Sequence, residues 1–273
     1  MPHCSRRLIL FLFILYPAIT FSQSTLPSNQ SDTISYIIQE TSIQEELNRA
    51  IGELESQFSQ NPFGLPAAKN EQLMDLFSEH FAPQKMLSPI RNTFQEQYNS
   101  DHAETTAESL SQPIVQQVLA YEKEFYSLQG IRKRVVNRHE LEQNPPSQER
   151  TKLVDSLAQQ MDLAPMEVES RAIIFRAMIS ALSELSAQRN FNEMQINSFV
   201  QNCRNQVSRQ IDQQLSNRLL LKYHGLEMEP LQKYSIFYQT PAGNWLSSTR
   251  TQAVHTALQQ SADEFMNAIG SIQ

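Results

Sequence analysis

Hydrophobic residues recur every three or four positions along most of the chain, which is the spacing of one face of an α-helix. The first periodic segment lies over residues 33–58, where Glu, Gln and Arg occupy most of the remaining positions. Its periodic positions are Ile34, Ile37, Ile38, Thr41, Ile43, Leu47, Ile51, Leu54 and Phe58. Ser31 and Asp32 are suited to cap the start of a helix, and Pro62 together with Gly64 stops it. The pattern therefore predicts one long helix.

Shorter periodic segments complete the first half of the chain. Apolar faces with helical spacing lie over residues 73–81 and, after Pro83, over residues 86–98. A polar stretch at residues 99–108 leads into a segment whose apolar positions begin at Ile114. We expect the helix that begins there to continue to about Leu141.

Asn144-Pro145-Pro146-Ser147 is the clearest linker, because two consecutive prolines remove two backbone donors and favour an extended chain. Beyond it, the pattern predicts helices over residues 153–161, 165–182, 192–223 and 230–238, and a last one from Pro241. We therefore expect an all-α, multi-helix bundle. It consists of an N-terminal helical half at residues 33–143, a Pro-rich linker at 144–147 and a C-terminal helical half at 148–273.

The two halves share a weak sequence similarity. Residues 90–98 can be aligned with residues 203–211, and residues 110–121 with residues 226–237 after an insertion of three residues in the second half. Two interpretations remain open. The halves are diverged copies, or they are unrelated amphipathic helices of similar composition.

The N-terminus has the pattern of a secretory signal peptide. Arg6 and Arg7 precede an apolar run at residues 8–15, and small residues follow at 20–22. The run is too short to span a membrane, which takes about 20 apolar residues. We predict cleavage after Ser22, a flexible leader at residues 23–32, no transmembrane segment in the mature chain, and a periplasmic or secreted location. An uncleaved anchor is the alternative.

Composition narrows the class of protein. Of the 273 residues 40% are apolar, only six are glycine and the formal charge is −7. Few glycines disfavour the tight turns of an all-β protein, and a net acidic chain is a poor general binder of nucleic acid. Cys203 is the one cysteine beyond the signal peptide, so an internal disulfide is excluded there. Its place on the apolar stripe of residues 196–219 predicts a buried, unreactive thiol.

A search for contiguous chemistry finds no complete motif. His139-Glu140 begins like a zinc-protease pattern, but Gln143 occupies the position of the second histidine. The sequence has no nucleophile elbow, no phosphate-binding glycine run and no C-x-x-C pair. We expect no catalytic, metal or cofactor site, and therefore no cofactor.

One basic cluster stands out in the acidic chain, formed by Arg132, Lys133, Arg134 and Arg138. It could attract an anionic lipid head group or an acidic partner. The interpretation we favour is that these cations lie late in a long helix, where they complement the negative end of its dipole.

The segment Phe237-Tyr238-Gln239-Thr240-Pro241-Ala242-Gly243 resembles the F-Y-x-[ST]-P-x-G signature of a family of exported bacterial helical proteins of unknown function. The resemblance implies an all-helical fold and export, and it implies no activity. Residue chemistry favours a structural corner over a ligand site. Thr240 suits the cap, Pro241 suits the first helical position, and Gly243 lets another helix approach closely. Phe237 and Trp245 are expected to pack across this corner, with the hydroxyl of Tyr238 at its edge.

These observations favour a non-catalytic, exported binding or interaction module, with an envelope protein as one candidate partner. A hydrolase or other enzyme is an alternative, with a non-contiguous site such as Glu122 or Glu167 beside a histidine. A cell-envelope assembly or chaperone-like factor with an apolar groove is another. A deep pocket with several perturbed pKa values favours an enzyme, and a shallow apolar groove favours binding.

Overall fold

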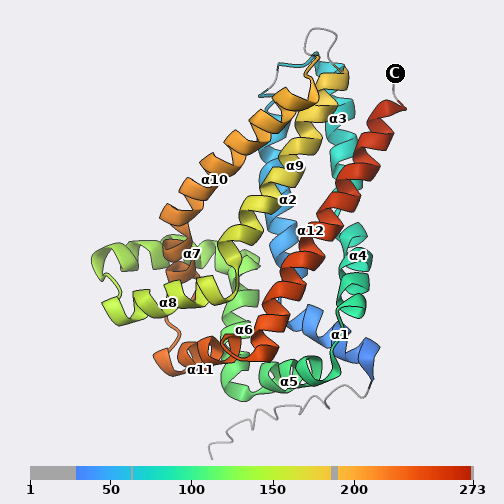
Figure 1. The fold of residues 1–273 in the computed structure, drawn as a ribbon. Helices are drawn as coiled ribbons and strands as arrows, with labels where there is room; N and C mark the ends of the chain where they lie inside the picture. Colours follow the sequence, from blue (N-terminus) through green and yellow to red (C-terminus); the bar gives the residue numbers. More distant parts are fainter. Residues whose placement is uncertain (1–28, 63, 186–189, 272–273) are drawn as a thin grey trace, which may run out of the picture.

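The computed structural model describes residues 29–62, 64–185 and 190–271, and shows helices joined by short connections (Figure 1). The helices are α1 (Gln30–Glu40), α2 (Ile43–Ser59), α3 (Ala67–His80), α4 (Pro83–Glu96), α5 (Ser100–Ser111), α6 (Pro113–Tyr126), α7 (Leu128–Gln143), α8 (Gln148–Gln160), α9 (Leu163–Leu185), α10 (Glu193–Lys222), α11 (Met228–Tyr238) and α12 (Pro241–Gly270). No strand occurs in these three ranges, and the all-α fold is confirmed. The predicted signal peptide and residues 23–28 of the leader lie outside the described residues.

Helix α12 is the central element of the packing. Figure 1 shows α2, α3, α9, α10 and α12 running lengthwise, while α5, α7, α8 and α11 lie crosswise in the lower part. Helix α12 packs on α3, α4 and α5 from before the Pro-rich linker, and on α9 from after it. The buried apolar residues form one cluster that draws on both sides of residues 144–147. The two predicted halves therefore share a hydrophobic core.

The predicted helix over residues 33–58 is two helices. Ser42 adopts a left-handed conformation with a φ of 52°, and α1 ends at Glu40. The hydroxyl of Thr41 donates to the carbonyl oxygen of Ile37 at 2.7 Å, a local bond that competes with the helical ladder. Asn29, rather than Ser31 or Asp32, caps α1 by accepting from the backbone N–H of Asp32. Apolar spacing missed the break because both helices bury the same periodic positions.

Two further boundaries differ from the prediction. The polar stretch at residues 99–108 belongs to α5, whose buried face includes the small residues Ala103, Thr106 and Ala107. A pattern of large apolar residues cannot reveal such a face. The helix expected from Ile114 to Leu141 divides at Ser127 into α6 and α7.

The corners between α6 and α7 and between α11 and α12 are built alike. Thr240 caps α12 by accepting from the N–H of Gly243 at 3.1 Å, and Ser127 caps α7 by accepting from the N–H of Gly130 at 3.0 Å. A Cβ atom on either glycine would clash with the backbone at the end of the preceding helix. The first corner reads Phe125-Tyr126-Ser127-Leu128-Gln129-Gly130. This segment has no proline, and no residue stands between Tyr126 and the capping Ser127, whereas Gln239 stands between Tyr238 and Thr240. Only the second corner therefore has the complete motif.

Helix α10 follows its prediction at both ends. It begins after a capping box formed by Asn192 and Gln195 and ends at the cap residue Tyr223. Cys203 is half-buried, however, and the neighbouring Phe199 is 37% exposed, so the buried-thiol prediction is wrong. This part of α10 lies at the edge of the bundle beside α9, which covers only one side of the helix (Figure 1). Burial still raises the pKa of the Cys203 thiol.

Within the described residues, no helix combines the length and the apolar character that a membrane span requires.

Candidate functional site

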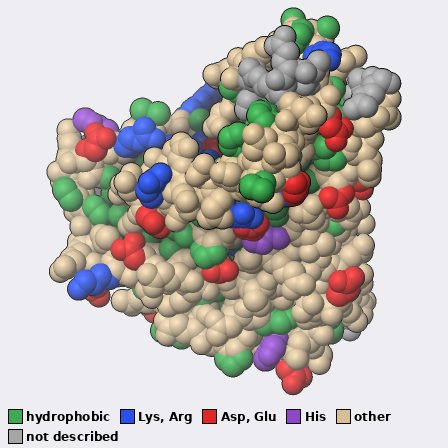
Figure 2. Space-filling model, turned by 45° about the horizontal axis from the view of Figure 1, so that its top comes forward, with side chains coloured by type: hydrophobic (Ala, Val, Ile, Leu, Met, Phe, Trp, Pro, Cys, Tyr) green, Lys and Arg blue, Asp and Glu red, His purple; other side chains and the backbone are tan. Residues whose placement is uncertain are grey.

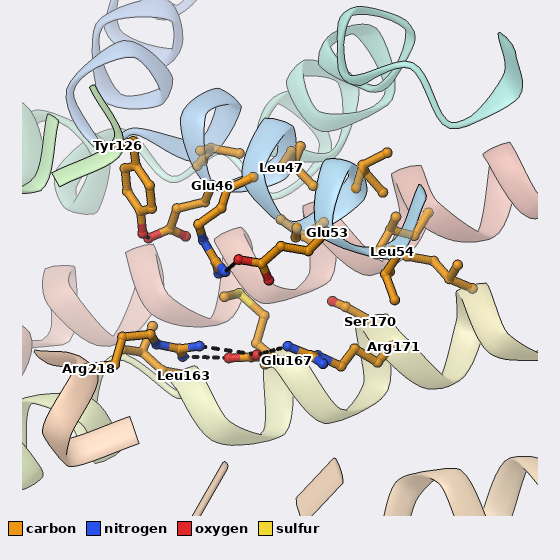
Figure 3. Close-up of a pocket in the computed structure, with 18 of the residues that line it drawn as sticks. Glu46, Leu47, Glu53, Leu54, Tyr126, Leu163, Glu167, Ser170, Arg171 and Arg218 are labelled. Carbon is orange, nitrogen blue, oxygen red and sulfur yellow. Dashed lines mark hydrogen bonds and ion pairs between the residues drawn. The ribbon is translucent and has the colours of Figure 1, made fainter. Parts of the chain in front are cut away.

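A cavity of about 100 Å³ lies between α2, α9, α10 and α12, and we call it the central cavity (Figure 3). Its apolar lining is Ile43, Leu47, Ala50, Ile51, Leu54, Leu163, Met166, Ile174, Leu219, Val254 and Leu258. Its charged lining is Glu46, Arg49, Glu53, Glu167, Arg171, Arg218 and Lys222, with Tyr126 and the polar Gln57 and Ser170. The cavity therefore combines an aliphatic wall with a set of ionised groups.

Glu46 of α2 is the centre of the first ionic group. Its carboxylate pairs with Arg250 of α12, lies 3.6 Å from the Nζ of Lys222 and accepts from the hydroxyl of Tyr126 at 3.0 Å. Burial opposes ionisation of Glu46, but Arg250 and Lys222 outweigh it and lower the pKa of this carboxyl to about 2. Burial, reinforced by Glu46, raises the pKa of Tyr126 to about 12. Glu46 stays ionised and Tyr126 stays neutral at ordinary pH.

A second ionic group lies along α9 in Figure 3. The carboxylate of Glu167 pairs with Arg218 of α10 at 2.5 Å and with Arg171 at 2.8 Å. Its pKa is lowered because bonding to these two guanidinium groups outweighs burial. Across the cavity, Arg49 pairs with Glu53 at 2.7 Å. The Nε of Arg49 is buried and has no hydrogen-bond partner among the described residues.

A third polar cluster is buried beside α6, α10 and α11, outside the lining of the central cavity. Glu122 accepts from the hydroxyl of Tyr223 at 2.5 Å and from that of Tyr234 at 3.4 Å. The Tyr234 hydroxyl also lies 3.4 Å from that of Tyr238. Burial, followed by the nearby charge of Glu122, raises the pKa of Tyr223 and Tyr234. These neutral hydroxyls satisfy a buried carboxylate, so the cluster has the character of a structural network.

The two carboxylates considered for a dispersed catalytic site have no histidine partner in the described residues. Glu122 contacts tyrosines, and Glu167 contacts arginines. His139 lies 2.9 Å from the side chain of Gln143. No cluster of His, Cys, Asp and Glu suited to a metal ion occurs in the parts of the chain that the structure describes.

The residues of the F-Y-x-[ST]-P-x-G motif lie at the α11–α12 corner, outside the lining of the central cavity. Phe237 and Tyr238 are buried in the last turn of α11, and Pro241 is at the start of α12. The expected packing of Trp245 on Phe237 is replaced by an edge-to-face contact with Phe94 of α4. The Nε1 of Trp245 donates to the carbonyl oxygen of Gln97 at 2.8 Å, which ties the corner to α4.

The basic cluster lies on α7, where the helix-dipole interpretation is wrong. Because α7 begins at Leu128, Arg132, Lys133 and Arg134 lie in the first half of the helix, and the last turn has no basic residue. Lys133 pairs with Glu124 at 2.5 Å, and the guanidinium of Arg134 lies 4.9 Å from the centre of the Phe125 ring.

A broad groove between α7 and α10 adjoins the central cavity. Arg134 and Arg138 of the basic cluster line this groove. The two spaces share Arg49, Glu53 and Arg218 as lining residues, so the charged end of the cavity borders the groove.

Sequence analysis missed the ionic residues of the central cavity, although one signal was present. Arg250 lies four residues after Leu246 and four before Val254, so a charge interrupts the inward stripe of α12. Lys222 likewise follows the apolar run Leu219-Leu220-Leu221. A charge on a buried stripe demands a partner of opposite sign. The identity of that partner, Glu46, depends on the packing of α2 and has no signature in the sequence.

Comparisons of the chain with models of protein families, with curated proteins and with solved structures found no match.

Proposed function

We propose that this protein is a non-catalytic binding module whose central cavity takes a small anionic amphiphile, a molecule with a short aliphatic chain and a negatively charged head. The observation that carries the proposal is the buried Nε of Arg49, a guanidinium donor without a partner at the charged end of an apolar cavity. Buried donors are normally paired, so an acceptor from a ligand fits this position.

The charges of the lining favour an anion over a cation. Four bases and three acids line the cavity, which leaves an excess of one positive charge. Each acid is already paired: Glu46 with Arg250 and Lys222, Glu53 with Arg49, and Glu167 with Arg171 and Arg218. A carboxylate or phosphate head can accept hydrogen bonds from the guanidinium groups of Arg49 and Arg218, because the planar guanidinium matches the geometry of both anions. The aliphatic wall is suited to the chain of the ligand.

The pKa shifts support binding over general acid–base catalysis. An effective acid or base has a pKa near the working pH. In the cavity, the pKa of Glu46 is lowered to about 2 and that of Tyr126 is raised to about 12. Both shifts move the pKa away from pH 7. The cavity is thus suited to hold a charge and poorly suited to transfer a proton.

The proposed place of action is outside the cytoplasm. The basic, apolar and small-residue pattern of residues 1–22 supports export, and the F-Y-x-[ST]-P-x-G resemblance supports membership of a family of exported helical proteins. Intact mass of the protein recovered from the exported fraction tests this part. A mature chain that begins at Gln23 is expected, and retention of residues 1–22 contradicts the cleavage.

Calorimetric titration tests the ligand class with three probes: octanoate, octylammonium and acetate. Octanoate is expected to bind at least about tenfold more tightly than the other two, because only octanoate has both the chain and the negative head. Arg49→Met is expected to weaken octanoate binding about tenfold. Arg204→Met is the matched control, because Arg204 forms an Arg–Glu pair with Glu169 outside the cavity. Equal binding of octylammonium, or no binding of octanoate, overturns the proposal.

A further inference from the structure

Helix α7 is the least buried helix of the described chain. Gly130 is its one buried residue, and the helix packs on α6 and α10. Leu128 is 81% exposed, Val135 73% and Val136 58%. Together with Ile131, these are four of the seven large hydrophobic side chains exposed in the described residues. Such a concentration on one helix indicates an interaction surface rather than the scattered apolar residues of an ordinary surface.

The apolar residues form a stripe next to basic ones. Leu128, Ile131 and Val135 are spaced three and four residues apart, which places them on one face of the helix. Arg132 follows Leu128 by four residues, and Arg138 follows Val135 by three, so both lie beside this stripe. Hydrophobic, basic and acidic side chains alternate on the left side of Figure 2, the side on which α7 and α8 lie. We call Leu128, Ile131, Arg132, Val135, Val136 and Arg138 the α7 surface.

The two arginines of the α7 surface are available to an outside anion. No ion pair or hydrogen bond of the Arg132 or Arg138 side chain occurs among the described residues, and both residues are exposed. Their position rules out stabilisation of the C-terminal end of the α7 dipole, because neither lies in the last turn. The formal charge of the whole chain is −7, so this concentration of unpaired cations runs against the overall charge.

From this geometry we infer that the α7 surface docks on the surface of an anionic lipid membrane. Its apolar stripe enters the boundary between head groups and acyl chains, and Arg132 and Arg138 contact the lipid phosphates. A helix that lies in the membrane plane combines apolar side chains on one face with flanking cations, as α7 does. An acidic protein partner would account for the arginines but leaves four exposed apolar side chains without a matching surface.

The α7 surface also adjoins the groove that borders the central cavity. Ile131, Val135 and Arg138 line the groove, and Arg49 and Arg218 line both the groove and the cavity. Docking through α7 therefore brings the charged end of the cavity close to the lipid. The inference does not rest on the ligand proposed for the cavity, because Leu128, Arg132 and Val136 line neither space.

Vesicle co-sedimentation of the whole protein tests the inference. We expect binding to vesicles of phosphatidylglycerol and phosphatidylethanolamine, and at least about tenfold weaker binding to phosphatidylcholine vesicles. Binding is expected to fall as salt is raised, because the cations are exposed. The double change Arg132→Gln/Arg138→Gln is expected to weaken binding to anionic vesicles by about tenfold or more. Leu128→Ser/Val135→Ser is expected to weaken it to a similar degree.

Two control variants change exposed residues elsewhere, one by replacing two arginines and the other by replacing one large apolar side chain. Arg91→Gln/Arg209→Gln removes two exposed arginines from α4 and α10, and Met194→Ser removes a side chain that is 80% exposed. Both are expected to bind anionic vesicles like the unmodified protein. All variants alter exposed residues, so thermal unfolding should be unchanged and a folding defect cannot account for lost binding. Equal binding to both vesicle types, or equal losses in the control and α7 variants, overturns the inference.

Discussion

The corners before α7 and before α12 share a hydroxyl cap and a glycine at the third helical position, yet α12 is buried in the core and α7 lies on the surface. After Thr240, α12 enters the core and buries Leu246, Arg250 and residues along its whole length. After Ser127, α7 buries only Gly130. The corner therefore sets the direction in which a helix leaves. The residues that follow the corner determine whether that helix becomes core or surface.

Charge shows the same contrast between the two helices. Arg250 on α12 is 3% exposed and paired with Glu46, whereas Arg132 on α7 is exposed and has no ion-pair partner in the described residues. Removing one partner of a buried pair leaves an uncompensated charge and destabilises the fold, whereas removing an exposed cation leaves stability almost unchanged. This contrast separates residues that hold the bundle together from residues that are free to interact.

The largest effect is expected from breaking the buried pair. Arg250→Met leaves the Glu46 carboxylate with less compensation inside the protein, and we expect the free energy of unfolding to fall by about 3–5 kcal/mol. Arg132→Met on α7 is expected to change it by less than about 0.5 kcal/mol. Urea denaturation of both variants measures the difference. Similar losses in the two variants would break the comparison between the helices.

Lowering the pH is expected to have the next largest effect, because it protonates Glu46, the partner of Arg250 on α12. The pKa of Glu46 is about 2 in the folded protein against an ordinary value of 4.5, so the unfolded chain takes up a proton first as the pH falls. The stabilisation is fully present above pH 4.5 and is lost as the pH falls through 2. It amounts to about 3 kcal/mol. Unfolding measured across this range should show a shallower loss in Glu46→Gln, and an unchanged acid profile in that variant contradicts the assignment.

The two corner glycines give a direct test of which helix depends more on its corner. A methyl group at Gly243 or Gly130 meets backbone atoms that cannot move aside like a side chain. Gly243→Ala is expected to cost about 3 kcal/mol because the buried α12 cannot shift freely. Gly130→Ala is expected to cost about 1 kcal/mol, because α7 buries only Gly130 and has little packing to lose if it shifts. Thermal melts rank the two, and the reverse order would show that α7 is the more constrained helix.

The caps are expected to give the smallest effects. Thr240→Ala and Ser127→Ala each remove one acceptor for a backbone N–H, which is worth about 1 kcal/mol. Thr240→Ser keeps the hydroxyl and should melt close to the unmodified protein. Repeating the melts with sulfate checks the alternative interpretation of the α12 corner. A rise in melting temperature that disappears in Thr240→Ala would indicate an anion site there.

The sequence was sufficient for the all-α class, for the break between helices at residues 144–147 and for the long helix α10. Residues 192–223 have both a capping signal and a regular apolar stripe, and α10 was placed almost to the residue. Helix breaks were harder to predict, because Ser42 and Ser127 interrupt stripes that continue across them. The buried face of α5 is made partly of alanine and threonine, which contribute little to an apolar pattern.

The central cavity lay beyond sequence reasoning for a different reason. Its charges come from helices far apart in the chain, and a pair such as Glu46 with Arg250 is created only by tertiary packing. The basic cluster on α7 was visible as a cluster, but its meaning depended on one boundary. Because the helix begins at Leu128, Arg132 and Arg134 lie near its start, and Arg138 lies in its second half but before the last turn.

The position of α12 also has a consequence for the order in which the protein can fold during synthesis. Its packing partners α3, α4 and α5 leave the ribosome long before Pro241, since more than a hundred residues separate α5 from α12. Until α12 emerges, these early helices lack the rings that α12 packs on them: Phe265 contacts Phe77 and Phe81, and Trp245 contacts Phe94. Long-range contacts of this kind delay completion of the core. The nascent chain therefore stays short of its native fold until residues 241–270 have been synthesised.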